Sequence, residues 1–583
     1  MIVTKLIGGY FLDKEFVDVA MKRKKTDLVL KNGKIIDVFS GTIIEDDLAI
    51  YKGMIVGWGD YSGEEEIDLE GKYISPGLID GHIHIESSYL TPEELGSLLP
   101  NFGTTTIIAD PHEIVNVCGL KGLDYMIQAS KKTKMDIKYV LPSCVPATPF
   151  ENAGAIVESK DMKDHMGMKE IIGLGEFMNF PGVINGDQEC IRKIDVAKEY
   201  GKIIDGHCPG LMGLDLNAYI GSGIGTDHEC MTIDEMKEKI SKGMYIQLRH
   251  GSACHDLERL IDEVNDSNYH RCMFCSDDRQ PETILKEGHI DNHLRISVNK
   301  GLDPIKAIRI ATINPANCYN LKDRGGIAPG RRADIAVFED LKDFKVAMTF
   351  IKGEKVSKDG KYLHPIEKAS IEKVSNSFKV KDFNSEKLKL KLKEKKVNVI
   401  QIVAGGVVTK KTVEEVELGT DGDIIFNPKK DIVKIGVIER HNSTGNVAVG
   451  LLKGYGIKKG AVAISIAHDS HNIIVAGTND RDMELAVNEV ILQNGGVVLV
   501  DDEKVLGKME LPIAGIMSPK SIEEVNNKLI EVHNIAIEKL GVNSNIDPIM
   551  TLCFMSLPVI PELKITDLGL FDVNTFSFIS VEA

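Results

Sequence analysis

Residues 74–88 read ISPGLIDGHIHIESS, an apolar run that ends in His82-Ile83-His84. The run has the length and composition of a buried strand, and residues two apart on a strand point to the same side. The two imidazoles can therefore bind one metal ion without bending the backbone. A lone pair of this kind is weak evidence, so its weight depends on what stands at the ends of the other strands.

Further apolar runs follow, separated by longer amphipathic stretches, which is the pattern of β/α repeats around a parallel sheet. We expect eight strands, near residues 78–84, 104–110, 137–143, 171–176, 202–207, 224–227, 244–248 and 271–277. This alternation predicts an α/β protein with a (β/α)8 barrel over residues 76–324. In such a barrel the chemistry gathers at the C-terminal ends of the strands.

Metal-ligand residue types recur at these strand ends. Glu176 ends IIGLGE, His207 ends KIIDGH, His228 follows GIGTD and Asp277 ends CMFCSD. Together with the first pair, five strand ends deliver four imidazoles and two carboxylates to one rim. Ionised carboxylates are rarely buried without a partner, so core packing explains this set poorly. We interpret the six residues as a metal site.

The segments on either side of the barrel have a different sequence pattern, typical of short β-strands. Residues 27–41, DLVLKNGKIIDVFSG, carry an Asn-Gly hairpin signal between alternating apolar residues, and short strands return at 325–356. We expect residues 1–75 and 325–375 to form one flanking β domain, a small β-sandwich. The stretch FNSEKLKLKLKEKKVN indicates a solvated linker or exposed helix at 376–396, and residues 397–583 a separate α/β domain.

Bulk properties narrow the class of protein. A chain of 583 residues with 43% hydrophobic and 27% charged residues is expected to form two or three compact domains. A net charge of −17 without a basic patch argues against nucleic-acid binding. The sequence lacks the pattern of a secretory signal or a transmembrane helix, and its ten cysteines form no regular framework, which favours a cytoplasmic enzyme that binds no membrane. We interpret Cys272 and Cys275, a CxxC, as core thiols.

The order of these motifs resembles the amidohydrolase superfamily, with HxH after strand one, a carboxylate after strand four, single histidines after strands five and six, and Asp after strand eight. Many members carry a modified lysine where this chain has Glu176, and that difference resembles the adenine deaminases of bacteria and archaea. Further matching segments are DPHEI at 110–114, GHCPG at 206–210, GTDHE at 225–229, SDDRQP at 276–281 and SIAHDSHNIIVAG at 465–477.

The resemblance implies hydrolysis of adenine to hypoxanthine and ammonia, a step of purine salvage. It implies two divalent ions, Mn²⁺ or Fe²⁺ rather than Zn²⁺, the first held by His82, His84, Glu176 and Asp277 and the second by Glu176, His207 and His228. Asp277 would accept the water proton and pass it towards the departing ammonia. Glu113 is the candidate acid for N1 of the purine, with a hydrogen bond to the ligand residues as the alternative.

Other candidates have two interpretations each. His112 is a surface residue or a partner of the ligands rather than a substrate contact. Glu86, two residues past His84, reaches the same face of the site, or it is a helix cap or another such partner. One of Asp278 and Arg279 holds the purine edge, or the two anchor a loop as an ion pair. His468 and His471 form a strand-end turn, or they line the pocket if the C-terminal domain closes over the barrel mouth.

Two rival functions remain open. The same metal rim would serve another nucleobase or a cyclic amide, because substrate choice depends on loop contacts. A non-catalytic scaffold usually loses ligands, and all six are present here. A homodimer or larger homo-oligomer is expected for an enzyme of this size.

Overall fold

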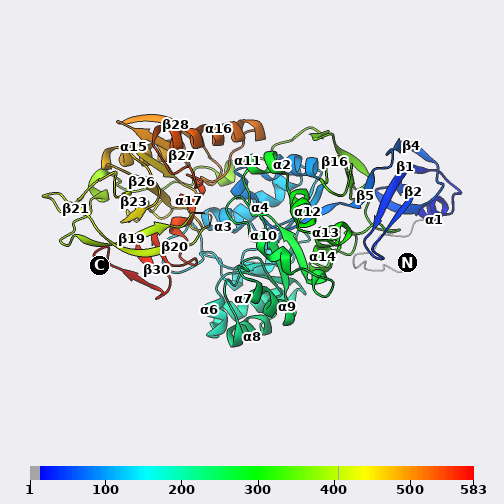
Figure 1. The fold of residues 1–583 in the computed structure, drawn as a ribbon, viewed down its shortest axis with the longest axis horizontal. Coiled ribbons are helices and arrows are strands. Elements are labelled where there is room, and N and C mark those ends of the chain that lie inside the picture. The colour runs from blue at the N-terminus through cyan, green and yellow to red at the C-terminus, as the bar shows by residue number, and fades with distance from the viewer. Residues whose placement is uncertain (1–13, 405) are drawn as a thin grey trace.

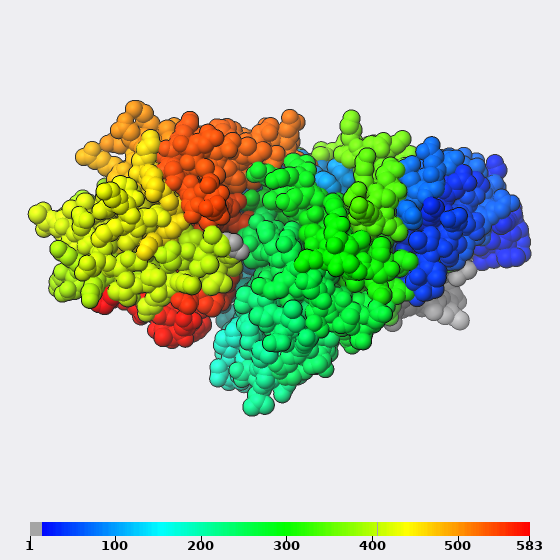
Figure 2. Space-filling view, in the orientation of Figure 1, coloured from blue at the N-terminus to red at the C-terminus, as the bar shows by residue number. Residues whose placement is uncertain are grey.

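The computed structural model describes residues 14–404 and 406–583. Figure 1 shows an elongated molecule in which the TIM-barrel-like α/β part lies between a flanking β domain and a C-terminal domain. The same three lobes are visible on the surface in Figure 2, where the C-terminal lobe presses against one side of the barrel.

The barrel strands follow the predicted runs closely. They are β6 (Leu78–His84), β7 (Thr104–Ala109), β8 (Asp136–Leu141), β9 (Ile171–Phe177), β10 (Ile203–Gly206), β11 (Thr226–Asp227), β12 (Tyr245–Arg249), β13 (Cys272–Cys275) and β14 (Asp277–Asp278). They form two parallel sheets, β10-β9-β8-β7-β6-β14 and β11-β12-β13. Because β14 follows β13 directly along the chain, the two sheets continue into one curled wall whose carboxyl ends share a rim.

Helices cover the outside of this wall. They are α2 (Pro92–Leu98), α3 (His112–Cys118), α4 (Leu120–Ser130), α5 (Ser159–Met166), α6 (Phe180–Ile184), α7 (Gln188–Glu199), α8 (Gly213–Gly221), α9 (Ile233–Ser241), α10 (Leu257–Leu260), α11 (Pro281–Glu287), α12 (Ile290–Asn299), α13 (Pro304–Ala311) and α14 (Ile313–Cys318). The strands are buried on both faces, as a parallel sheet between helices requires.

The flanking segments pair into one sheet, as the short strand-like runs in both segments predict. Its nine described strands are β1 (Thr26–Asp37), β2 (Thr42–Tyr51), β3 (Met54–Trp58), β4 (Gly63–Asp68), β5 (Tyr73–Pro76), β15 (Ile335–Phe338), β16 (Val346–Ile351), β17 (Glu354–Lys358) and β18 (Lys361–Tyr362). The antiparallel pair β5–β15 joins the two halves. The sandwich arrangement stays a prediction.

The Asn-Gly hairpin prediction is wrong. Asn32 and Gly33 lie inside the continuous strand β1, where the register against β2 shifts between Leu30 and Gly33. Asn32 has a φ of 54°, the left-handed conformation that Asn-Gly favours in a turn and that also suits a β-bulge. The β1–β2 reversal comes later, ahead of Thr42, so the dipeptide bends a strand rather than ending it.

The C-terminal domain is built on an eight-stranded, mostly antiparallel sheet. Its order is β20 (Thr409–Glu415), β19 (Lys396–Ile402), β24 (Val447–Lys453), β23 (Ile432–Ile438), β26 (Ile473–Gly477), β25 (Ala461–Ile464), β27 (Gly496–Asp501) and β28 (Lys504–Glu510). The helices α15 (Asp480–Leu492) and α16 (Ile522–Asn534) pack on it, and α16 also contacts α11 of the barrel. Among the described residues, no helix is long and apolar enough to cross a membrane.

The charged stretch before this domain is neither an exposed helix along its length nor wholly solvated. It contains one short 3₁₀ helix, Ser385–Leu388, and the side chains of Leu388, Leu390 and Leu392 are buried in the core of the C-terminal domain. Leucines alternate with lysines here, so an extended chain turns one type inward and the other outward. The charged side chains therefore lie only on the outer side of the segment.

Candidate active site

A small cavity of about 40 Å³, with room for a few water molecules, lies at the carboxyl ends of the barrel strands. Its barrel lining includes five of the six predicted metal ligands, His84, Glu176, His207, His228 and Asp277. The sixth, His82, is fully buried behind them. The C-terminal domain contributes Val407, His468, Asp469, Phe554, Leu557 and Ile560. The pocket is therefore formed by two domains.

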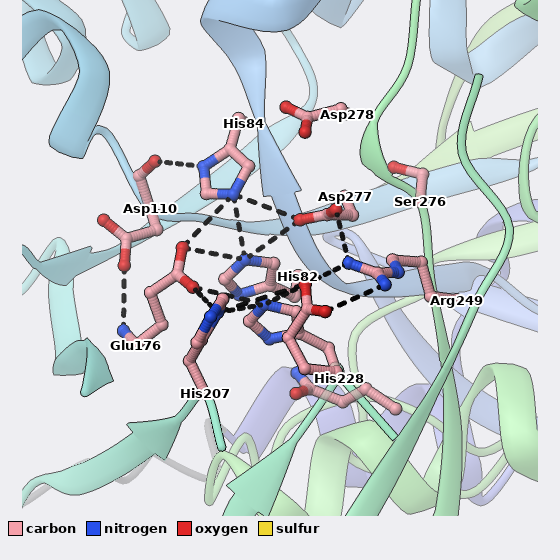
Figure 3. A network of polar contacts seen from close by, with 12 residues as sticks. His82, His84, Asp110, Glu176, His207, His228, Arg249, Ser276, Asp277 and Asp278 are labelled. Atoms are coloured by element: carbon pink, nitrogen blue, oxygen red, sulfur yellow. Dashed lines mark hydrogen bonds and ion pairs between the residues drawn. The ribbon is translucent and has the colours of Figure 1, made fainter. Parts of the chain in front are cut away.

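Glu176 lies at the centre of this group, with each carboxylate oxygen turned to a different pair of histidines (Figure 3). Its Oε1 is 3.3 Å from His84 Nε2 and 3.7 Å from His82 Nε2. Its Oε2 is 2.7 Å from His207 Nδ1 and 3.2 Å from His228 Nε2. Burial raises the pKa of Glu176, but His228 and His207 hold it well below its ordinary value. The carboxylate is charged and can bridge two positive centres.

Asp277 closes the group on the side of the first histidine pair. Its Oδ1 is 3.1 Å from His84 Nε2, and its Oδ2 is 3.2 Å from Arg249 Nη1. Burial opposes ionisation of Asp277, yet His84 and Arg249 hold its pKa well below the ordinary value. The residue is therefore an ionised base at neutral pH, and one of its oxygens faces the histidines.

The residues fit divalent metal ions. The Nε2 atoms of His82 and His84 stand 3.2 Å apart, and His207 Nδ1 stands 3.4 Å from His228 Nε2. Two ring nitrogens that face each other this closely need a shared proton or a cation between them. The donors of His82, His84 and Glu176 lie within 4.8 Å of one another, as do those of Glu176, His207 and His228. Mixed imidazole and carboxylate donors suit manganese, iron or zinc.

Buried partners orient these ligands. Asp205, at the end of β10, accepts a hydrogen bond from His82 Nδ1 over 3.2 Å. Asp110 accepts twice, from His84 Nδ1 at its backbone carbonyl over 3.0 Å and from the Glu176 backbone N–H at Oδ2 over 2.9 Å. Such contacts fix the ring tautomer and aim the other nitrogen at the metal.

Glu113 enters the pocket from the first turn of α3, where it meets the C-terminal domain. His468 Nδ1 lies 2.5 Å from its Oε1, and His471 Nε2 contacts its Oε2. Burial raises the pKa of Glu113, but the two histidines hold it well below its ordinary value. Both histidines of the HDSH segment thus contact the same barrel carboxylate.

The remaining candidates separate into different places. His112 is buried rather than at the surface, with Nδ1 3.4 Å from Glu176 Oε1, because α3 begins at the pocket rim. Glu86 accepts the Ile114 backbone N–H over 3.2 Å and so caps that helix. Asp278 lines the pocket and takes a hydrogen bond from Ser87.

Arg279 lies outside the pocket lining. Its guanidinium donates to the His250 carbonyl over 2.9 Å and pairs with Glu287 over 3.2 Å, away from the pocket lining. Asp277 and Asp278 both line the pocket, whereas Arg279 is fully buried outside that lining. The loop-anchoring interpretation applies to Arg279, although its partner is Glu287 and not Asp278.

Sequence reasoning missed Asp205, Glu229 and Arg249. Each had a signal, because KIIDGH, GTDHE and YIQLRH all place a charged residue at a strand end next to or near a histidine. The pocket residues of the C-terminal domain apart from the HDSH segment had none, since apolar side chains such as Phe554 resemble ordinary core residues.

Comparison with known proteins agrees with this geometry. Residues 73–356 match the amidohydrolase family, and residues 406–577 match the adenine deaminase C-terminal domain. The chain is 55% identical to adenine deaminase 2 of Desulfotalea psychrophila over 98% of this chain and 99% of that one. It is 52% identical to the adenine deaminase of Ligilactobacillus salivarius over 97% and 98%. The chain belongs to the adenine deaminase family.

The two matched regions are the two parts of the chain that form the pocket. The amidohydrolase match covers the strands that carry the metal-ligand residues, and the C-terminal match covers the HDSH segment. Among solved structures, the β-aspartyl dipeptidase of Fervidobacterium islandicum aligns at a TM-score of 0.46 and 19% identity, over 58% of this chain and 99% of that one.

Proposed function

We propose that this protein is an adenine deaminase that hydrolyses adenine to hypoxanthine and ammonia. The observation that carries the proposal is Glu176, whose two oxygens face two histidine pairs in a buried pocket. The strong similarity to adenine deaminases along nearly the whole chain supports the choice of substrate.

The ligand sets would be His82, His84, Glu176 and Asp277 for one ion and Glu176, His207 and His228 for the other, with Mn²⁺ or Fe²⁺ as the proposed metals. When bound, such ions make water a nucleophile near neutral pH and stabilise developing negative charge. The proton transfers and the orientation of the reacting groups depend on protein side chains.

In this proposal Asp277 moves protons at the reacting carbon. It accepts the first proton of the attacking water while oxygen bonds to C6, and it returns that proton to the amine as the C6–N bond breaks. Arg249, on its other oxygen, keeps the carboxylate oriented. Glu113, which also lines the pocket, would protonate N1 when the ring loses its aromaticity.

The test is ammonia release from adenine by protein reconstituted with Mn²⁺ or Fe²⁺, beside Glu176→Gln and a panel of guanine, cytosine and cyclic amides. We expect turnover of adenine by the wild type, loss of turnover in the variant, and little ammonia from the other substrates. A clear preference for guanine or cytosine would replace the proposed substrate and leave the metal site standing.

A further inference from the structure

The HDSH segment of the C-terminal domain, residues 468–471, contacts a carboxylate of the barrel through its two histidines. Glu113 Oε1 receives His468 Nδ1 over 2.5 Å, and His471 Nε2 contacts Oε2. Both oxygens are therefore engaged by imidazoles from another domain, and all three residues are buried.

The histidine turn is itself held rigidly. Buried Arg440 donates to the His471 carbonyl and, over 2.8 Å, to that of Ala514. His441 Nε2 donates to the Ser470 carbonyl over 2.7 Å, and Asn472 Nδ2 reaches the carbonyl of Asn152 on the barrel loop after β8 over 2.8 Å. The turn is thus fixed both to its own domain and to the barrel.

His468 also faces the cavity. It belongs to the pocket lining, and its ring stacks on Phe554 with centroids 4.7 Å apart. The charged and titratable groups around it are Glu113 on α3, Asp278 on β14, and Asp469 and His471 on its own loop. Three carboxylates surround one imidazole, an arrangement that stabilises the imidazolium.

These contacts change how Glu113 can act. A carboxylate held ionised by two histidines cannot by itself donate a proton to a purine nitrogen. Burial lowers the pKa of His468, but the Glu113 charge and hydrogen bond outweigh it and raise that pKa to about 9. The proton of the pair therefore sits on the imidazole at neutral pH.

We propose that His468 is the source of the proton that Glu113 delivers to N1 of adenine, and that His471 is the positioning residue that holds Glu113. This inference rests on the proposed function. In the step, the N–H bond of His468 Nδ1 breaks as Glu113 Oε1 takes the proton, and Glu113 passes it to N1 as oxygen bonds to C6. The second water proton, released when the C6 carbonyl forms, restores the pair through solvent, so protons balance over the cycle.

Two substitutions separate proton supply from positioning. In His468→Asn the amide nitrogen stands near the place of Nδ1, so a donor to Glu113 remains but no titratable proton does. In His471→Gln the amide nitrogen stands near the place of Nε2, so the hold on Glu113 remains. His533→Gln is the matched control, since His533 on α16 pairs with Glu282 of the barrel outside the pocket.

We expect His468→Asn to lower kcat about 100-fold, the usual size of a general-acid contribution, with KM and metal content nearly unchanged. His471→Gln should keep most of the activity and His471→Ala should lose it. In the wild type, kcat should fall above a pH of about 9, and that fall should be absent from the residual activity of His468→Asn.

Three results would overturn the inference. The first is a wild-type kcat in His468→Asn. The second is a third metal ion per chain that His468→Asn loses, since Glu113, His468 and His471 could also hold a cation. The third is a wild-type kcat that stays flat to pH 10, a measurement that does not depend on the folding of any variant. Wild-type protein that releases no ammonia from adenine would instead refute the proposed function, and the inference with it.

Discussion

Arg249 Nη1 lies 3.2 Å from Asp277 Oδ2 in a buried part of the pocket. The same guanidinium contacts Glu229 and pairs with Asp256 over 2.9 Å, so three carboxylates share one cation. Breaking a buried pair by removing one partner is far more costly than losing a surface pair. The base proposed for catalysis therefore depends on an arginine that is not a metal ligand.

Replacing this arginine tests the dependence. Arg249→Met should lower the free energy of unfolding by about 3–5 kcal/mol, measured by denaturant titration of metal-loaded protein, and should also lower kcat. Arg259→Met is the control, because Arg259 pairs with the same Asp256 but is mostly exposed, and it should change stability by under about 1 kcal/mol. Equal effects of the two substitutions would show that burial of Arg249 is not what matters.

The hydrogen bond from His82 to Asp205 predicts a change in metal affinity. Asp205→Asn weakens the acceptor that orients His82 Nδ1, and loss of such a partner typically costs 10–100-fold in metal affinity. Competition with a chelator measures the change directly. The exposed Asp215→Asn should leave the affinity at the wild-type value, and an unchanged affinity in Asp205→Asn would mean that the tautomer of His82 is fixed by other groups.

Lys564 predicts a pH dependence of stability. Its ammonium is fully buried and donates to the carbonyls of Val407 and Phe554, both of which line the pocket, over 2.9 Å each. Burial lowers the pKa of Lys564 to about 7 from an unfolded value of 10.5. Between these values the unfolded chain binds more protons, so this residue makes stability rise with pH, and its cost is fully present only below pH 7.

The comparison with Lys564→Met isolates this effect. From pH 7 to 9, the stability of the wild type relative to the variant should rise by up to about 1.4 kcal/mol per pH unit. Exposed Lys508→Met provides the baseline, for which no such trend is expected. A constant difference between wild type and Lys564→Met across this range would contradict the lowered pKa.

The leucines of the charged segment predict a further stability effect. Leu388 is fully buried in the core of the C-terminal domain, and deletion of a buried leucine side chain costs about 2–5 kcal/mol. Leu388→Ala should therefore destabilise the protein by that amount in denaturant unfolding. Lys391→Ala, on the outer side of the same segment, should have little effect, and similar values for both would restore the solvated-linker interpretation.

The sequence by itself determined the barrel strands and the positions of six candidate metal ligands at their ends. Parallel strands that are buried on both faces leave continuous apolar runs, and a metal site needs ligand types where those runs end, so both features are local and visible in order along the chain. The strand-end positions of Glu176, His207 and His228 can be read in this way from the sequence alone. The Asn32-Gly33 pair shows the limit of local signals, because the same left-handed preference serves a turn and a bulge.

Only the tertiary structure decided which side chains share the pocket. Glu113 and His468 are separated by 355 positions, and no local pattern connects an α3 carboxylate with a turn in another domain. The same holds for Arg249 and its three carboxylates. Spacing along a strand or helix fixes the direction of a side chain relative to its neighbours, whereas contact between elements depends on how whole domains pack, which is a sum over many weak apolar contacts that no single motif carries.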